Sequence, residues 1–310
     1  MTSVLVLSGG LSPERDVSLR SGRRAAEAIR EARPDWEVRE ADVDAGLLTL
    51  LNDHRPDYVV PLLHGSAGED GALRDLLDAL ELPYLGSQAT ACRLAFDKPV
   101  ASALVSATGI AVPEFLVLPQ SFFRELGAAA VMQAVGERLG FPLVVKPTRG
   151  GSALGVSVVH SPAELPAAMV GAFSYADTAM IQRHISGTEI AASVIDTDVE
   201  PRVLPLVEIV PEGDLYDYNA RYTAGTTEFF CPARLTDETA DAVRDVALTV
   251  HGALGLEAFS RCDVIVDADG NVWFLEVNVA PGMTETSLLP QAISAENASL
   301  GDILATLIEA

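Results

Sequence analysis

Lysine is nearly absent from this sequence of 310 residues. It occurs only at Lys98 and Lys146, whereas arginine occurs nineteen times. One explanation is that two surface lysines escaped a general drift towards arginine. The other is that these positions need a compact, strongly hydrated ammonium, which a planar guanidinium does not replace. The surroundings of Lys146, described below, favour the second explanation, and those of Lys98 alone leave both open.

Cysteine and long apolar runs are also scarce. Cys92, Cys231 and Cys262 are widely spaced and form no Cys-x-x-Cys pair, which argues against a structural zinc site or a disulfide framework. We expect Cys262 to be a small core residue. No apolar run approaches the ~20 residues of a membrane-spanning helix, and the first residues lack the features of a signal peptide. The protein is therefore expected to be cytoplasmic and not to bind membranes.

Basic residues are outnumbered by acidic ones. The chain has 21 lysines and arginines against 44 aspartates and glutamates, which gives a net charge of −23. Such a charge argues against nucleic acid and anionic membrane surfaces as partners. Any phosphate that this protein binds would need local cations or a divalent metal to offset the overall field.

The order of expected elements predicts an α/β fold in three parts, 1–96, 97–183 and 184–310. In the first part, Val4–Leu7 reads as a buried strand that ends in Gly9-Gly10, and a helix face follows at Val17, Ser21, Ala25, Ala28 and Ile29. A second strand, Tyr58–Leu63, enters a glycine-rich loop. Two strand–loop–helix units indicate a doubly wound domain that binds its ligand at the carboxyl ends of its strands. Gly9-Gly10 lacks the rest of a dinucleotide fingerprint, which disfavours NAD.

The second part contains an expected strand at Phe115–Leu118 and an expected helix near 121–138. The apolar run Phe141–Val145 then leads to Lys146, and a glycine-rich turn at Arg149–Gly155 follows. A cation at the end of a strand beside exposed backbone N–H groups is the arrangement that a phosphate requires.

The third part carries two strand-like runs on either side of Asp269-Gly270, a strong hairpin signal. With these two residues as the loop, Asp263 pairs with Glu276 and Arg261 pairs with Asn278. Side chains alternate along a strand, so all four would lie on one face. An ordinary salt-bridged hairpin is the plain alternative. Two opposed carboxylates repel without a cation, however, and with an amide oxygen beside them they favour a Mg²⁺ site.

The sequence resembles the D-alanine–D-alanine ligases of the ATP-grasp superfamily nearly from end to end. Five blocks carry the resemblance, in the family's order: Gly9–Ser18, His64–Gly71, Lys146–Gly155, Tyr216–Tyr222 and Glu276–Leu288. It implies a doubly wound N-terminal domain followed by two α+β subdomains that enclose the nucleotide. The implied reaction is phosphorylation of one D-alanine carboxylate by ATP, attack on the acyl phosphate by the amine of a second D-alanine, and release of phosphate.

The resemblance also implies residue roles. The implied catalytic residues are Glu14, Ser152, Tyr222, Arg261 and the backbone N–H of Gly282. The implied nucleotide contacts are Lys98, Lys146, Gln182, Arg183, Ile185, Glu189 and Arg221. The amino-acid substrates would contact Glu14, His64, Ser287 and Leu288. The ligands of two Mg²⁺ ions, or of Mn²⁺, would be Asp263, Glu276 and Asn278. Similar proteins are usually homodimers.

Several positions depart from the family pattern. Gly150 and Ala153 stand where an acid and a second serine are usual, Gln182 stands for an acid, and Arg221 stands for a lysine. Gln182 can still accept a hydrogen bond through its carbonyl oxygen. Two other functions stay open: a regulator that binds ATP without turnover, and a ligase for a different D-amino or D-hydroxy acid. His64 fits equally a structural loop histidine or a catalytic one.

Overall fold

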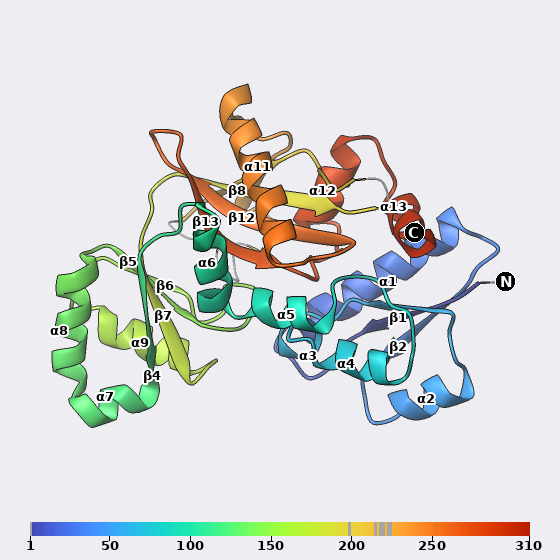
Figure 1. Ribbon diagram of the computed structural model, residues 1–310, viewed down its shortest axis with the longest axis horizontal. Coiled ribbons are helices and arrows are strands. Elements are labelled where there is room, and N and C mark those ends of the chain that lie inside the picture. The colour runs from blue at the N-terminus through green and yellow to red at the C-terminus, as the bar shows by residue number, and fades with distance from the viewer. Residues whose placement is uncertain (1, 198–199, 214–215, 217–220, 222–224) are drawn as a thin grey trace.

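The computed structural model describes residues 2–197, 200–213, 216, 221 and 225–310. Three β-sheets follow one another along the chain, and helices pack on them (Figure 1). The sheets fall within the three expected parts, and the α/β fold class is confirmed. The boundaries of the parts stay a prediction.

The N-terminal sheet is parallel, with the order β2-β1-β3. Its strands are β1 (Ser3–Ser8), β2 (Glu37–Asp42) and β3 (Tyr58–Pro61). The predicted strand at Val4–Leu7 is almost fully buried because helices cover both faces of a doubly wound sheet. The helices of this region are α1 (Arg15–Ala32), α2 (Leu47–Asp53), α3 (Ser66–Glu69), α4 (Ala72–Ala79) and α5 (Ala89–Phe96). The carboxyl ends of β1 and β3 lead to the glycine loops that carry Glu14 and His64.

The predicted face of α1 is buried, as its spacing required. Val17, Ser21, Ala25 and Ile29 are buried, and Ala28 is half-buried. Two of the buried positions on this helix are serines, Ser18 and Ser21, which are completely shielded from solvent. Buried hydroxyl groups need hydrogen-bond partners, and those of Ser21 are described with the site.

The central sheet is antiparallel, with the order β4-β7-β5-β6. It consists of β4 (Phe115–Pro119), β5 (Leu143–Pro147), β6 (Ser157–Val159) and β7 (Thr178–Arg183). Helices α8 (Ala128–Leu139) and α9 (Leu165–Phe173) cover one face, where they bury Leu143 and Val145. The alternate residues Val144 and Lys146 therefore point to the opposite face, which lines a cavity.

The single helix predicted near 121–138 is wrong. The structure has α7 (Gln120–Leu126) and then α8, and the break falls at Gly127. Gly127 has a φ of 83°, in the left-handed region that glycine adopts without steric cost. The apolar pattern continues across the break, so periodicity alone did not reveal it.

The third sheet contains the path β11-β10-β8-β12-β13, and β9 pairs with β8. The strands are β8 (Thr188–Ile195), β9 (Arg202–Val203), β10 (Val207–Pro211), β11 (Thr227–Phe230), β12 (Phe259–Val266) and β13 (Val272–Asn278). Helix α11 (Asp237–Ala253) and the end of α6 (Lys98–Ala107) bury one face of this sheet. Cys262 lies on that face and is fully buried, as predicted. The other face is turned towards the central sheet and the N-terminal domain.

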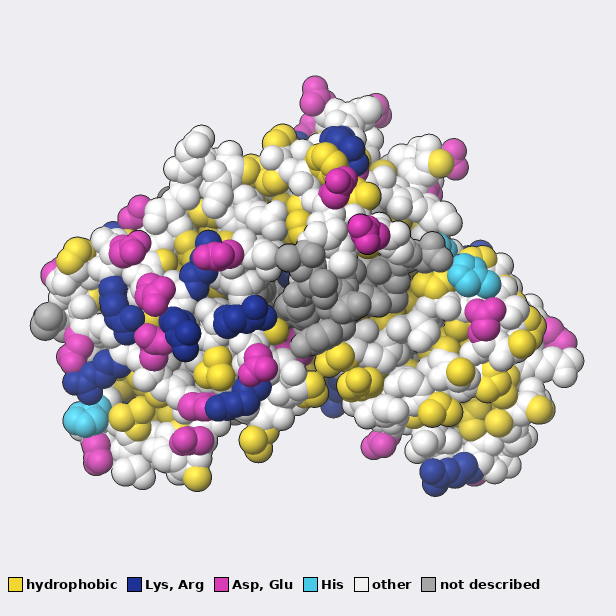
Figure 2. All heavy atoms as spheres, turned by 180° about the vertical axis from the view of Figure 1, so that it is seen from behind, with side chains coloured by type: hydrophobic (Ala, Val, Ile, Leu, Met, Phe, Trp, Pro, Cys, Tyr) yellow, Lys and Arg dark blue, Asp and Glu magenta, His cyan; other side chains and the backbone are white. Residues whose placement is uncertain are grey.

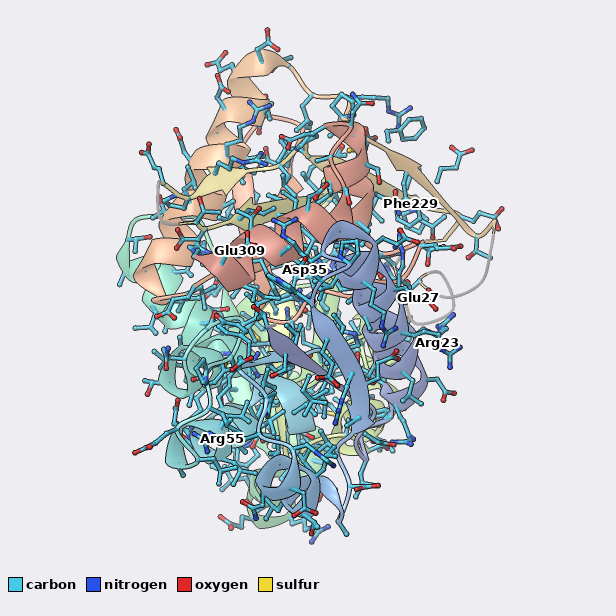
Figure 3. All side chains as sticks on the ribbon, turned by 90° about the vertical axis from the view of Figure 1, so that its right-hand side faces the viewer. Arg23, Glu27, Asp35, Arg55, Phe229 and Glu309 are labelled. Carbon is cyan, nitrogen blue, oxygen red and sulfur yellow. The ribbon has the colours of Figure 1, made fainter. Side chains whose placement is uncertain are left out.

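The chain closes with α12 (Leu288–Ala295) and α13 (Leu300–Glu309), which return to the N-terminal domain. Helix α13 packs along α1, and Figure 3 shows Glu309 near the end of α13. The Arg33 side chain donates two hydrogen bonds of 2.9 Å to Glu309. Gly301 permits this approach because a Cβ there would overlap the Ala28 carbonyl group. The first and last parts of the chain are thus joined by a packed helix pair.

None of the helices within the described ranges is long and apolar enough to cross a membrane. The three cysteines are free thiols. On the back of the molecule, arginine and acidic side chains are interspersed over the end that lies to the right in Figure 1 (Figure 2).

Candidate active site

Two neighbouring cavities hold nearly all the residues expected to be functional. The larger, of about 390 Å³, lies between the central and third sheets. Its lining includes every expected nucleotide contact, Lys98, Lys146, Gln182, Arg183, Ile185, Glu189 and Arg221, and also Asp263 and Glu276. The smaller, of about 70 Å³, is lined by Glu14, His64, Ser152, Arg261, Asn278, Gly282, Ser287 and Leu288. Gly151, Tyr216 and Arg221 line both cavities, so the two adjoin.

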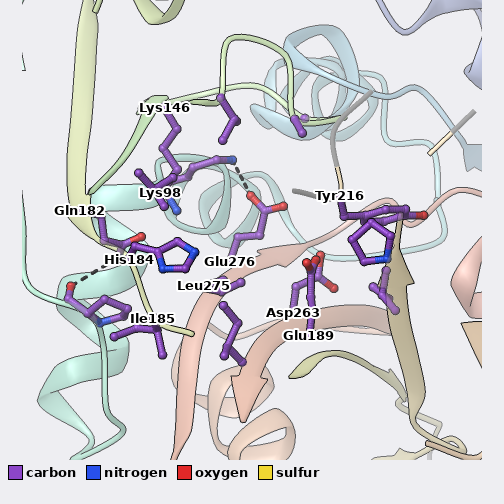
Figure 4. Close-up of a pocket in the computed structure, with 18 of the residues that line it drawn as sticks. Lys98, Lys146, Gln182, His184, Ile185, Glu189, Tyr216, Asp263, Leu275 and Glu276 are labelled. Carbon is purple, nitrogen blue, oxygen red and sulfur yellow. Dashed lines mark hydrogen bonds and ion pairs between the residues drawn. The ribbon is translucent and has the colours of Figure 1, made fainter. Parts of the chain in front are cut away.

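The two lysines converge on one carboxylate in the larger cavity (Figure 4). Lys98 begins α6, and its Nζ lies 2.8 Å from Glu276 Oε2 and donates to the Gly150 carbonyl oxygen at 2.8 Å. Lys146 lies in β5 and is 7% exposed. Burial disfavours its charged form and lowers its pKa to about 8, although Glu276 opposes this effect. Two partly desolvated ammonium groups facing one cavity wall form a receptor for anionic oxygen atoms.

The acidic hairpin has the predicted pairing at its four polar residues. Arg261 is opposite Asn278, and Asp263 is opposite Glu276. The predicted two-residue loop is wrong, because the pairing shifts after Asp263 and the strands are joined by residues 267–271. The shift is a β-bulge, which adds one residue to β13.

The bulge changes which side chains reach the cavity. Strict alternation from Glu276 would turn Leu275 away from the acidic face, but Leu275 lines the larger cavity beside Glu276. Two consecutive residues face the same side because the extra residue interrupts the alternation. The cavity wall is therefore apolar at Leu275 and ionic at Glu276.

The carboxylates of the hairpin are both paired with cations. Asp263 is 3% exposed, and its two oxygens accept from Arg261 Nε and Nη2, each at 2.7 Å. Asn278 Nδ2 also donates to Asp263, at 3.3 Å. Burial favours the neutral form of Glu276, but Lys98, Arg221 and Lys146 outweigh it and lower its pKa to about 2. Glu276 is thus held as an anion, and Asp263 is ion-paired with Arg261.

The far end of the larger cavity is formed by β7 and the residues that follow it. Gln182 is buried, and its amide nitrogen donates to the Pro113 carbonyl oxygen at 3.3 Å. A carbonyl can only accept, so the side-chain oxygen of Gln182 is left for another donor. The Arg183 side chain is half-exposed and paired with Glu114, and the Arg183 N–H donates to the Glu114 carbonyl oxygen at 2.8 Å. Burial raises the pKa of Glu189 to about 7.

The smaller cavity joins the glycine loop to the N-terminal domain. Ser152 donates a hydrogen bond to Glu14, which is 5% exposed. Burial, the largest influence, raises the pKa of Glu14. Arg221 stacks on the Tyr216 ring at 4.3 Å and donates to the Tyr216 carbonyl oxygen at 3.1 Å. Tyr222, the third expected member of the group with Glu14 and Ser152, lies outside the described residues.

His64 lines this cavity, and both of its ring nitrogens have partners within the protein. It is 4% exposed, and its Nδ1 lies 3.1 Å from the Ala280 carbonyl oxygen while its Nε2 lies 3.0 Å from Ser21 Oγ. Burial lowers its pKa to about 4, so the imidazole is neutral at pH 7. Both ring nitrogens have partners within the protein, which favours the structural interpretation of this histidine.

The last wall of the smaller cavity is the beginning of α12. Ser287 precedes the helix, and its Oγ accepts from the Thr284 N–H at 3.0 Å and lies 2.8 Å from Thr284 Oγ1. The first backbone N–H groups of a helix have no partner within the helix and attract anions. Leu288 is the first residue of α12, so this end of the cavity suits a carboxylate.

Within the described residues, no group of three or more histidine, cysteine, aspartate or glutamate side chains is placed to hold a metal ion. The expected metal site differs in kind, because it consists of two carboxylates and an amide. Asp263 and Glu276 line the larger cavity and Asn278 lines the smaller one. The three side chains therefore border the junction of the two cavities.

Comparison with known proteins identifies this arrangement. Residues 104–309 match the family model described as "D-ala D-ala ligase C-terminus". The D-alanine–D-alanine ligase of Anaeromyxobacter dehalogenans is 39% identical over 306 residues, which cover 99% of this chain and 96% of that protein. The chain belongs to the D-alanine–D-alanine ligase family. The ligase of Fervidobacterium nodosum is 38% identical over 313 residues, covering 98% of this chain and 97% of that one.

Solved structures agree with the family assignment and with the ATP-grasp fold. The D-alanine–D-alanine ligase of Bacillus anthracis in complex with ATP has a TM-score of 0.80 and 28% identity, and covers 100% of this chain and 96% of its own. The VanG D-Ala:D-Ser ligase of Enterococcus faecalis has a TM-score of 0.84 and 28% identity, and covers 99% of this chain and 98% of its own.

The glycine-rich turn at Arg149–Gly155 departs from the usual sequence of the D-alanine–D-alanine ligase family. Ser152 and Ala153 both have left-handed backbones, with φ of 49° and 54°. Gly150, at the position of the usual acid, presents its carbonyl oxygen to Lys98. The loop is therefore fixed to α6 through its main chain, and this contact does not depend on the missing acid.

One ionisable group of the site was overlooked in the sequence. Glu69 belongs to the family block His64–Gly71, but it was given no role. It lines the smaller cavity, is 7% exposed, and accepts from the Gly65 N–H at 2.8 Å. Burial, assisted by the nearby Glu14 charge, raises its pKa. In the sequence, Glu69 is only a glutamate in a glycine-rich loop, which is a weak signal of function. Its burial beside Glu14 depends on the tertiary structure.

Proposed function

We propose that this protein joins two D-alanines in an ATP-dependent reaction that releases ADP and phosphate, in the cytoplasmic synthesis of peptidoglycan precursors. The observation that carries the proposal is the junction of the two cavities. Lys98, Lys146 and Glu276 face the larger cavity, while Glu14, Arg261 and Ser287 face the smaller one. A phosphoryl donor in the first cavity can thus meet a carboxylate in the second, with fixed cations on both sides.

The larger cavity has the features that a nucleotide needs. The base would lie at the Gln182 end, where the side-chain oxygen is positioned to accept from an exocyclic amine. Glu189 offers a carboxylate further along the same wall for the ribose hydroxyl groups. The phosphates would extend to Lys98 and Lys146, whose ammonium groups concentrate positive charge at the junction.

The residues at the junction fit a divalent metal. Glu276 is held as an anion, and Asp263 and Asn278 provide further oxygen atoms, which are the ligands that Mg²⁺ prefers. When bound, Mg²⁺ would neutralise charge on the phosphate oxygens. Mn²⁺ has the same ligand preference. Arg261 pairs with Asp263, and Lys98 pairs with Glu276.

The smaller cavity would hold the amino acids. Glu14 would accept from the ammonium of the first D-alanine. Arg261 and the Gly282 N–H would stabilise the oxygen that becomes negative when the amine attacks the acyl phosphate. Ser287 and the N-terminus of α12 would hold the carboxylate of the second D-alanine. Amino acids bound in this small cavity would displace water from it, which would protect an acyl phosphate from hydrolysis.

A second candidate is a ligase that joins D-alanine to a different D-amino or D-hydroxy acid. The similarity to a D-Ala:D-Ser ligase supports it. Tyrosine at position 222 favours an amide product, because a neutral phenol would neither repel the D-alanine ammonium nor add a cation for a lactate carboxylate. D-Alanine is therefore the acceptor that we propose.

The test is an assay of ADP release with ATP, Mg²⁺ and a panel of D-amino and D-hydroxy acids, singly and in pairs, with mass analysis of the products. We expect the D-alanyl-D-alanine dipeptide as the main product. A main product that contains D-serine or D-lactate would support the second candidate. No ADP release above the background with any member of the panel would indicate a nucleotide-binding regulator. The expected homodimer is tested separately by light scattering.

A further inference from the structure

The loop between β13 and α12 is held from outside by the N-terminal domain. Ala280 and Met283 flank Pro281 and Gly282 in this loop. The Ala280 carbonyl oxygen lies 3.1 Å from His64 Nδ1. The Met283 N–H donates to Ser21 Oγ at 3.1 Å, and Arg24 Nη1 donates to the Met283 carbonyl oxygen at 3.0 Å. These three hydrogen-bond contacts hold the loop in place on both sides of Gly282.

The chemistry of the partners fixes where each proton lies. The Ala280 carbonyl can only accept, so His64 carries its proton on Nδ1. The neutral ring then has an acceptor at Nε2, which lies 3.0 Å from Ser21 Oγ. Ser21 has one proton to donate, and it must go to His64 because the Met283 N–H already donates to Ser21. The result is one directed chain from Met283 through Ser21 and His64 to Ala280.

Gly282 depends on its neighbours for its position. It has no side chain to anchor it, and a Cβ would come within 2.7 Å of Ser287 Oγ, so the residue cannot acquire one without movement. Ser21 and Arg24 lie three residues apart on α1 and therefore face the same side of the helix. The N–H and the carbonyl oxygen of Met283 are thus both bound by side chains of one helix.

We infer that Ser21, Arg24 and the neutral Nδ1–H form of His64 are positioning residues that aim the Gly282 N–H at the reacting carboxyl oxygen. The inference rests on the proposed function, in which that N–H stabilises the oxyanion. A preorganised donor lowers the barrier because it needs no reorientation when the charge develops. Loosening it should slow turnover and leave substrate binding nearly unchanged. His64 then acts through the loop and transfers no proton to the substrate.

The kinetic test compares Ser21→Ala with a matched variant, Ser18→Ala. Both serines are fully buried on α1, but Ser18 binds the Leu62 carbonyl oxygen and the Gly9 N–H, each at 2.8 Å, and not the loop. We expect a comparable fall in melting temperature for both variants. In Ser21→Ala, kcat should fall about tenfold or more, a part of the ~100-fold loss seen when an oxyanion donor is removed. The KM values for ATP and D-alanine should stay within about twofold, and Ser18→Ala should keep its kcat.

A surface variant covers the case in which Ser21→Ala does not fold. Arg24→Met removes the donor to Met283 but keeps an unbranched stem, and Arg23→Met is its control on the exposed neighbouring position. Arg24→Met should lower kcat without raising KM, and Arg23→Met should do neither. Equal kcat in both members of the folded pairs would overturn the inference and leave the proposed function standing.

A spectroscopic measurement tests the proton arrangement without turnover. Imidazole ¹⁵N spectra at pH 7 should show His64 with a protonated Nδ1 and an unprotonated Nε2, identified by its absence in His64→Asn. An Nε2–H form or a charged ring would overturn the directed chain. If the wild type shows the expected form but does not use D-alanine, the proposed function fails and the loop contacts remain. The two failures are thus distinguishable.

Discussion

Replacing Lys146 by methionine should stabilise the protein and inactivate it at once. Lys146 is 7% exposed, and its pKa falls from an ordinary 10.5 to about 8 because burial disfavours the charge. A change of that size corresponds to about 3 kcal/mol of unfavourable free energy for the charged form at neutral pH. This value already includes the attraction of Glu276. Methionine has a similar length and carries no charge to desolvate.

The sign of the pH dependence follows from the direction of the shift. Between pH 8 and 10.5 the unfolded chain holds a proton on Lys146 that the folded chain has lost, so the stability of the wild type rises with pH across this window. Below pH 8 the full penalty is present. The free energy of unfolding of Lys146→Met should therefore exceed that of the wild type by about 3 kcal/mol at pH 7. This difference should shrink towards zero near pH 10.5.

The assay is denaturant unfolding at several pH values, together with ADP release at pH 7. Lys98→Met is the control, because Lys98 is directly paired with Glu276, and its loss leaves a half-buried carboxylate without that partner. We expect Lys98→Met to lose stability, and both variants to lose turnover. A Lys146→Met protein that is less stable than the wild type at pH 7, or whose advantage does not change with pH, would refute the reasoning.

Three further predictions concern catalysis. Asp263→Asn and Glu276→Gln should each abolish Mg²⁺-dependent turnover while circular dichroism stays unchanged, since each removes a charged oxygen ligand; more than a tenth of wild-type activity in both would contradict the metal site. Lys146→Arg and Lys98→Arg should both impair ATP turnover, because a guanidinium does not fit a point-charge position; two kinetically silent variants would contradict this. With ATP, D-alanine and excess D-lactate at pH 7, the dipeptide should dominate by mass, and a dominant depsipeptide would contradict the role expected of Tyr222.

The elements that position the site could be predicted because each leaves a local pattern. The buried strands at Val4 and Lys146 are short apolar runs that end in glycine loops, and β12 and β13 are joined by a turn signal. Alternation then required Asp263 and Glu276 to share a face, and the structure bears this out. The family resemblance added the residues that no pattern connects, such as Glu14 and Ser152, which are distant in sequence.

Other features depend on tertiary packing and left no such pattern. The bulge at Leu275 depends on how β13 meets β12, and alternation predicted the opposite side for that residue. The break at Gly127 is one glycine in a continuous apolar pattern. Ser21 was recognised only as part of a helix face, because a serine in a helix gives no sign that its hydroxyl joins two distant loops.

The central claim is that a carboxylate of D-alanine is phosphorylated at the junction of the two cavities. It is tested most directly with D-alanine labelled with ¹⁸O in its carboxylate, unlabelled ATP and Mg²⁺. Transfer of the phosphoryl group to that carboxylate, followed by attack of the second amine, leaves one labelled oxygen in the released phosphate. We predict inorganic phosphate with one ¹⁸O atom for each dipeptide formed, and unlabelled ADP. Label in AMP, or phosphate without label alongside dipeptide, would contradict the account.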